Sequence, residues 1–514
     1  MKFVYACFFT ALIATPCTHA GELPQPVLDA LQQARIPVAS VGVVVREINA
    51  DTPLLQLNGK RPMNPASTMK LLTTYAALEL LGPAYSWKTE AWLDGKLEHG
   101  VLHGNLIVKG YGDPKITMEQ MWLWLHELRN RGLREIAGDV VMDRSAFEAM
   151  EVDPAAFDND PGRAYNVGPD ALLLNFNAIR LRFIPADGKI NVITEPELAG
   201  YTLDNRLVVN GRGNHCGNWD DNVHIQLNGA SIQIRGSYPL NCGEHDKPIS
   251  LLPHGRYFDA VFRALWQEVG GTLRGNAREG ITPANATLLS THYSQPLSEL
   301  IRDINKFSNN VMARQLFLSL GANNGSTAPA MDIPQPGDAA PTETGTEQTA
   351  PPLIQPAAPP STKLAEILNP HTPPPASIAR SELALRNWLS HKGLSFPELV
   401  LENGAGLSRK ERITPINLSL LLQSAQQSPL SAEIEASLPI VGVDGTLKKR
   451  LDNCPVSNHA HLKTGSLEGV KAIAGYIQSR SGRQWIMVFL INHPNASAGQ
   501  RAQDALIEWL EQHY

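Results

Sequence analysis

The sequence predicts a mixed α+β fold in which an antiparallel sheet is flanked by helices and a mostly β accessory region is inserted into the chain. Strand-like segments occur near both ends, at residues 38–45 and 54–57 and again at residues 470–478 and 484–492. Helical patterns lie between them, whereas residues 96–252 hold many short segments of alternating polarity. Strands at both ends with helices between them are typical of one sheet built from the two ends.

The helices are placed by apolar periodicity and by their start and stop residues. They are predicted at residues 67–81, 117–132, 256–270, 297–320 and 497–512, with a short break near residue 308. The first begins just after Pro65 and stops at Gly82-Pro83, where the chain cannot continue a helix.

The length of 514 residues exceeds the size of a single hydrophobic core, so more than one domain is expected. We expect one domain from residues 21–95 and 253–514, and an inserted accessory domain from residues 96–252. Residues 322–376 are rich in Pro, Ala, Thr and Gln, and such a segment buries too little apolar surface to fold alone. It is therefore predicted to be a flexible loop, with a docking site for a partner protein as the alternative.

The first twenty residues resemble an export signal. Lys2 precedes an apolar run at residues 3–14, and Thr18-His19-Ala20 fits a small-x-small cleavage pattern. The run is too short to span a bilayer. We therefore expect a mature, soluble protein in an extracytoplasmic compartment, with no membrane span.

Composition narrows the function classes. The net charge of −6 gives no basic footprint for nucleic acid. Cys216 and Cys242 flank strand-like segments and are expected to form a disulfide in an oxidising compartment, which leaves Cys454 as a buried thiol. No His or Cys spacing is typical of a zinc site, so no metal is expected.

A candidate nucleophile lies at the start of the first helix, in Ser67-Thr68-Met69-Lys70. At i, i+3 spacing the serine hydroxyl and the lysine amine share one helix face. A serine is a weak nucleophile without a nearby base, and a desolvated lysine can be that base. The helix start also favours negative charge that develops near Ser67.

A second element, Ser308-Asn309-Asn310, lies in the break between two helical patterns. The Ser308 hydroxyl can relay a proton to a leaving amine, and the Asn310 amide can hold a peptide backbone. The alternative is that Ser308 is simply the N-cap of the following helix.

A third element, Lys463-Thr464-Gly465-Ser466, opens the penultimate strand. Lys463 and Thr464 can bind a substrate carboxylate while the strand aligns a peptide by β-augmentation. Gly465 lets a ligand approach the backbone closely.

The three elements together resemble the motif set of penicillin-binding proteins and class A β-lactamases. With the long insertion between Lys70 and Ser308, the chain is similar to the class C low-molecular-mass penicillin-binding proteins, the D-Ala-D-Ala carboxypeptidase/endopeptidase branch. Further stretches that resemble this family are residues 112–114, 138–140, 175–177, 402–409, 444–447 and 475–476. The resemblance implies a penicillin-binding transpeptidase-like domain, which requires no cofactor.

The resemblance assigns each motif a role. Ser67 would attack the carbonyl between two terminal D-alanines, Lys70 would be its base, and the backbone N–H groups of Ser67 and Ser466 would form the oxyanion hole. Ser308 and Asn310 would lie on the proton path.

The resemblance also implies how the substrate is held. Lys463, Thr464 and Gly465 would bind the peptide, and Asp143 and Arg409 would recognise the side chain of the stem peptide.

The function expected from the resemblance is a periplasmic D-alanyl-D-alanine carboxypeptidase that also cleaves cross-linked peptides as an endopeptidase. Its partners would be peptidoglycan stem peptides, β-lactams as inhibitors, and wall enzymes that bind the Pro-rich loop. Two alternatives are a β-lactamase and a non-catalytic peptidoglycan-binding scaffold. The long insertion argues against the first, and the intact motifs argue against the second.

Overall fold

The computed structural model describes residues 22–210, 216–322, 374–452 and 454–514. The predicted export signal and nearly all of the Pro-rich segment lie outside the described residues. Within the described residues, no helix combines the length and the apolar character that crossing a membrane requires.

The chain divides into two compact units, which we describe separately. The terminal unit comprises Met1–Thr68, Phe396–Val400 and Lys410–Tyr514. The central unit comprises Met69–Ser395 and Leu401–Arg409.

The terminal unit is built on an antiparallel five-stranded sheet in the order β16-β17-β18-β1-β2, as the sequence predicted. Its strands are β1 (Val41–Glu47), β2 (Leu55–Leu57), β16 (Ala460–Leu467), β17 (Val470–Gln478) and β18 (Gln484–Asn492). Pairing of β1 with β18 joins the two ends of the chain. Six of the seven residues of β1 are buried, because helices cover both faces of the sheet.

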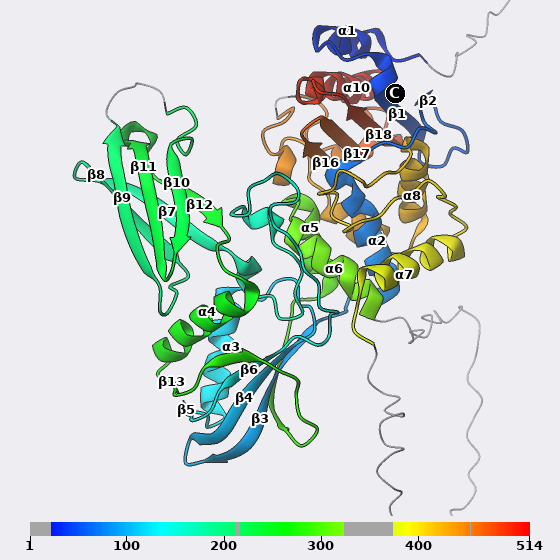
Figure 1. The fold of residues 1–514 in the computed structure, drawn as a ribbon. Coiled ribbons are helices and arrows are strands. Elements are labelled where there is room, and N and C mark those ends of the chain that lie inside the picture. Colours follow the sequence, from blue (N-terminus) through cyan, green and yellow to red (C-terminus); the bar gives the residue numbers. More distant parts are fainter. Residues whose placement is uncertain (1–21, 211–215, 323–373, 453) are drawn as a thin grey trace, which may run out of the picture. The chain divides into compact units, whose positions relative to one another are not determined.

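The described part of the terminal unit has four α-helices, α1 (Gln25–Gln33), α8 (Pro415–Gln427), α9 (Ser431–Ser437) and α10 (Gln500–His513). Helices α1, α8 and α10 are labelled in Figure 1. Helices α1 and α10 pack on each other on one side, while α8 packs against β1 and β18. A side chain at Gly42 would put its Cβ 2.6 Å from Met63 Sδ and 2.7 Å from Pro415 Cγ, so glycine allows α8 to lie directly on β1.

The central unit contains a helical cluster of α2 (Lys70–Leu81), α5 (Leu297–Lys306), α6 (Asn310–Ala322) and α7 (Ile378–His391). Helix α2 is apolar on every side, and nine of its twelve residues are buried. Trp388 of α7 packs edge-on against Tyr75 of α2, with ring centroids 4.9 Å apart, and its Nε1 donates to Glu79 Oε2 at 2.9 Å. Helix α7 is thereby fixed against α2.

The central unit also holds a seven-stranded sheet with the main order β13-β5-β4-β3-β15, to which β6 and β14 add through β4. Its strands are β3 (Lys88–Glu98), β4 (Val101–Gly110), β5 (Glu135–Ile136), β6 (Val140–Asp143), β13 (Thr272–Leu273), β14 (Ala277–Glu279) and β15 (Thr287–Tyr293). Helices α3 (Met118–Asn130) and α4 (His254–Glu268) contact it. The sheet therefore includes strands on both sides of the predicted insertion, residues 96–252, and the division into domains stays a prediction.

Two three-stranded sheets complete the central unit. One has the order β12-β7-β8 and the other β10-β11-β9. Their strands are β7 (Ile179–Ala186), β8 (Lys189–Glu195), β9 (Thr202–Asn210), β10 (Val223–Asn228), β11 (Ser231–Pro239) and β12 (His245–Ile249). A disulfide joins Cys216 to Cys242. Cys454, expected to be buried, is only half-buried, and its Sγ lies 3.4 Å from Glu508 Oε1.

The Trp388 contact predicts a measurable loss of stability. Trp388→Ala removes a buried indole and its hydrogen bond to Glu79, so we expect the free energy of unfolding of the helical cluster to fall by about 3–5 kcal/mol. Leu383→Ala, on the same helix at a side chain that is 54% exposed, should change it by less than about 0.5 kcal/mol. Denaturant unfolding checks both variants, and equal losses in the two would contradict the packing role.

Candidate active site

Ser67 lies in a 3-10 turn, Ala66–Met69, that leads directly into α2. The turn is shaped by its own side chains. The Ala66 N–H donates to Asn64 Oδ1 at 2.9 Å, and the Thr68 hydroxyl donates to the Pro65 carbonyl at 2.7 Å. Ser67 itself is half-buried.

The turn is also hydrogen-bonded to the five-stranded sheet of the terminal unit. The Asn64 N–H donates to Asn492 Oδ1 at 2.8 Å, and Asn492 Nδ2 donates back to the Asn64 carbonyl at 3.1 Å. Asn492 is the last residue of β18. Neither asparagine was predicted from the sequence, because an isolated Asn pairs with a distant one only in the folded chain.

Gly465 lies against the same turn. Strand β16 is at the edge of the sheet and carries the Lys463-Thr464-Gly465 motif. A Cβ at Gly465 would lie 2.8 Å from the Ser67 nitrogen and 2.9 Å from the Pro65 carbonyl oxygen, closer than real Cβ contacts come. Only glycine therefore lets the strand edge run beside the Ser67 backbone. Ser466, the next residue, is exposed.

Lys463 is fully buried on β16. Its Nζ donates to the Thr464 carbonyl at 2.8 Å. Burial disfavours the charged ammonium and lowers the pKa of Lys463 to about 7. Its charge therefore changes near neutral pH.

Thr464 has a partner that the sequence analysis had not assigned a role. The Thr464 and Thr446 hydroxyl oxygens are 2.8 Å apart. Thr446 lies in the 3-10 turn Gly445–Leu447, whose preceding residue Asp444 accepts the Ile440 N–H at 2.9 Å. The resemblance in residues 444–447 was the available signal, but the contact itself depends on the fold.

In the central unit, Lys70 is fully buried at the start of α2. Its Nζ donates to Asn310 Oδ1 at 2.6 Å and to the Ala405 carbonyl. One turn later, the Thr73 hydroxyl donates to the Gly404 carbonyl at 2.6 Å. The structure thus brings together the first and second motifs and the stretch at residues 402–409.

Ser308 occupies an unusual backbone conformation between α5 and α6. Its φ of 57° lies in the left-handed region, which residues other than glycine adopt rarely. Asn309 Oδ1 accepts the Met312 N–H at 3.1 Å and so bonds to the first turn of α6. The alternative that Ser308 is the N-cap stays a prediction. Strain of this kind, about 1–3 kcal/mol, is concentrated at functional sites.

Asp143 and Arg409, the predicted stem-peptide residues, both lie in the central unit. Asp143 is fully buried, and its carboxylate accepts the N–H and hydroxyl of Ser145 and of Thr282 over 2.6–3.1 Å. Burial alone would raise its pKa, but these hydrogen bonds hold the pKa below its usual value. Arg409 is exposed, and its guanidinium lies over the Phe157 ring, 4.9 Å from the centroid. Recognition of substrate by either residue stays a prediction.

Comparisons with known proteins show which family the chain resembles. A family description, the D-Ala-D-Ala carboxypeptidase 3 (S13) family, matches residues 23–332 and 364–513. The D-alanyl-D-alanine carboxypeptidase DacB of Haemophilus influenzae is 25% identical over 460 residues, 88% of this chain and 85% of that protein. A D-alanyl-D-alanine carboxypeptidase of Actinomadura sp. (strain R39) is 27% identical over 508 residues, 94% and 84% of the two chains.

A solved structure shows the same fold. The crystal structure of penicillin-binding protein 4 from Haemophilus influenzae aligns with a TM-score of 0.70 at 23% identity, covering 94% of this chain and 99% of that one. The family match spans most of the chain and includes all three motifs. The protein therefore belongs to the D-Ala-D-Ala carboxypeptidase 3 (S13) family and is a serine-type carboxypeptidase.

Proposed function

We propose that this carboxypeptidase removes the terminal D-alanine from peptidoglycan stem peptides through an acyl-enzyme on Ser67. The observation that carries the proposal is the buried amine of Lys70. It lies three residues from Ser67 on one helical segment, and Asn310 and Ala405 hold its nitrogen. A desolvated amine at this spacing is a suitable base for a serine hydroxyl.

Acylation breaks the peptide bond between the two terminal D-alanines. The Ser67 hydroxyl oxygen attacks the carbonyl carbon and transfers its proton to the neutral amine of Lys70. The resulting oxyanion accepts hydrogen bonds from the backbone N–H groups of Ser67 and Ser466. When the tetrahedral intermediate collapses, the Lys70 ammonium returns that proton by way of Ser308 to the leaving D-alanine nitrogen, and the ester on Ser67 remains.

Deacylation uses water in the same way. Water loses a proton to the base and attacks the ester carbonyl, and the Ser67 oxygen leaves with a proton restored to it. This restores the free enzyme and releases the shortened stem peptide. Ser308 and Asn310 serve both half-reactions, because the same proton path is used in both directions.

Lys463 and Thr464 would bind the carboxylate at the end of the substrate. The Lys463 ammonium supplies the opposite charge, and the Thr464 hydroxyl, oriented by Thr446, supplies a hydrogen bond. A penicillin, which carries a carboxylate beside a strained amide, would be attacked by Ser67 in the same orientation. In a cross-linked peptide the leaving group is a longer amine, so endopeptidase activity follows if the site accepts it.

The chain's place of action follows from this substrate. Peptidoglycan lies outside the cytoplasmic membrane, so we propose that the protein acts in the periplasm, with β-lactams as inhibitors and wall enzymes as partners of the Pro-rich segment.

Removal of the nucleophile gives the first test. Ser67→Ala deletes the attacking oxygen, so release of D-alanine should fall by at least about a thousandfold. Mass spectrometry after incubation with penicillin should show one covalent adduct on the unaltered protein and none on the variant. Retained activity in a folded Ser67→Ala protein would refute the assignment, and rapid turnover of penicillin would instead indicate a β-lactamase.

The Lys463 pKa predicts how substrate binding depends on pH. With a pKa of about 7, the charged form falls from about nine-tenths at pH 6 to about one-tenth at pH 8, so affinity for a carboxylate should fall about tenfold. Calorimetry with Ser67→Ala protein and a peptide ending in D-Ala-D-Ala measures this change. The same peptide with an amidated end should bind with no such slope, and a slope in both would point to a different group.

Gly465→Ala tests the close approach of β16 to the Ser67 turn. The added Cβ would displace the strand edge from the Ser67 nitrogen, so the rate of acylation by penicillin should fall about a hundredfold. Stopped-flow acylation measures the rate, and thermal unfolding shows whether the variant is folded. A folded variant with unchanged acylation would contradict the proposed contact.

A further inference from the structure

The central unit contains a groove of about 1610 Å³ that includes none of the three motifs. Its lining comes from several elements: residues 150–154 and 160–162, strand β10, the first turn of α4, and strand β14. The volume exceeds the ~300–1,000 Å³ that is usual for sites of small molecules. A groove of this size fits several units of a polymer.

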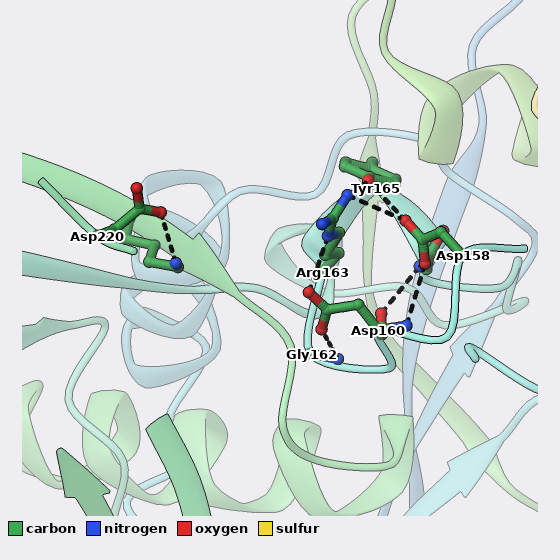
Figure 2. Close-up of polar contacts among 8 residues, drawn as sticks. Asp158, Asp160, Gly162, Arg163, Tyr165 and Asp220 are labelled. Atoms are coloured by element: carbon green, nitrogen blue, oxygen red, sulfur yellow. Dashed lines mark hydrogen bonds and ion pairs between the residues drawn. The ribbon is translucent and has the colours of Figure 1, made fainter. Parts of the chain in front are cut away.

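One wall of the groove is fixed by a network of charged side chains (Figure 2). Arg163 Nε donates to Asp160 Oδ2 at 2.8 Å and Nη1 donates to Asp158 Oδ2 at 3.2 Å. The Tyr165 hydroxyl donates to Asp158 Oδ2 at 2.7 Å, and the Gly162 N–H donates to Asp160 Oδ1 at 3.2 Å. Asn166 Nδ2 also donates to Asp158 Oδ1 at 2.8 Å, so all of these bonds lie within residues 158–166 and this wall is held locally.

Hydrogen bonds and ion pairs between distant segments hold other parts of the lining. The Ser250 N–H donates to the Gly162 carbonyl at 2.9 Å, which fastens this wall to the segment before α4. Arg144 bridges Asp170 and Glu279 and joins the end of β6 to β14. A groove whose walls are fixed without a ligand loses little conformational entropy when it binds one.

The lining presents charges of both signs. Arg256, in the first turn of α4, is exposed and has no ion pair among the described residues. The start of α4 adds positive partial charge to it. Glu151 and Asp153 are also exposed and lie on either side of Val152, an apolar side chain that is 44% exposed. A ligand that complements this lining would carry carboxylates, amines and short apolar groups.

The segment of residues 150–162 connects the groove with a predicted substrate residue. Phe157 lies between the groove residues 150–154 and 160–162 in the sequence, and its ring supports the Arg409 guanidinium. The groove therefore lies beside the segment on which the predicted stem-peptide residue rests.

We propose that this groove binds a second stretch of peptidoglycan, a stem peptide other than the one being cleaved. Its carboxylates would meet Arg256 and the start of α4, and its amino groups would meet Glu151 and Asp153. The inference rests on the proposed function, because it takes the polymer to be the substrate. Binding of remote parts of a polymer strengthens its attachment without changing the chemistry on a short peptide.

Charge reversal in the groove tests the proposal. In Ser67→Ala protein, which leaves the wall intact, Arg256→Glu should weaken co-sedimentation with purified peptidoglycan about fivefold. With Ser67 present, the variant should raise KM on polymeric wall by a similar factor and leave cleavage of a soluble D-Ala-D-Ala peptide unchanged. Arg501→Glu, the same change at an exposed position on α10, is the matched control and should change neither.

A steric variant gives a second test. A Cβ at Gly255 would meet Met142 Cε at 3.5 Å and nothing nearer, so Gly255→Ala fits whereas Gly255→Phe fills the groove. Only the larger side chain should weaken wall binding.

The outcomes separate the groove from the active site. If neither Arg256→Glu nor Gly255→Phe alters wall binding, the proposal is wrong. If Arg256-dependent wall binding is present but the unaltered enzyme releases no D-alanine from any peptide, the groove stands and the proposed reaction fails.

Discussion

The site depends on keeping the amine of Lys70 buried and yet bonded. A lysine at the start of an apolar helix loses its hydration, and an unpaired polar group there would destabilise the fold by several kcal/mol. Asn310 and the Ala405 carbonyl supply the bonds that water would otherwise supply. Helix α6 and residues 402–409 must therefore stay fixed against α2. The left-handed backbone conformation of Ser308 lies directly before α6 and so helps to place Asn310 at the start of that helix.

In the terminal unit, the position of the Ser67 turn is fixed mainly by backbone contacts. The Ser67 turn is bonded to Asn492 at the end of β18, and β16 approaches it so closely that Gly465 has room for no side chain. These contacts use backbone groups and one asparagine pair, so they define the position of the Ser67 N–H before substrate arrives. Preorganised donors of this kind stabilise an oxyanion without reorganising during the reaction.

Both lysines of the motifs are buried and bonded. Lys70 donates to Asn310 and the Ala405 carbonyl, and Lys463 donates to the Thr464 carbonyl, while burial lowers the pKa of Lys463 to about 7. At the groove, by contrast, most charged side chains form ion pairs, such as Arg144 with Glu279 and Arg163 with Asp160, whereas Arg256 forms no ion pair among the described residues. The ion pairs hold the shape of the groove, and an exposed charge without an ion pair is available to a ligand.

The sequence by itself determined much of this protein. Four strands of the sheet in the terminal unit followed from alternating and apolar runs, whereas β16 was not predicted as a strand separate from β17. The helices α2, α3, α4 and α10 followed from periodicity and stop signals. The three motifs predicted a nucleophile, its base and a substrate-binding strand. These features are local, so a short window of residues contains the whole signal.

The tertiary structure decided what depends on distant partners. Helices α1, α7, α8 and α9 escaped prediction, as did the start of the seven-stranded sheet at Lys88, ahead of the expected boundary at residue 96. Thr446 beside Thr464, the Asn64–Asn492 pair and the bond between Asn309 and Met312 became visible only in the folded chain. The hydrogen bonds that the Asp143 carboxylate accepts from Ser145 and Thr282 likewise became visible only in the folded chain. Each of these is a contact between surfaces that only the packed chain brings together, and hydrogen-bond geometry is not encoded in any single stretch of sequence.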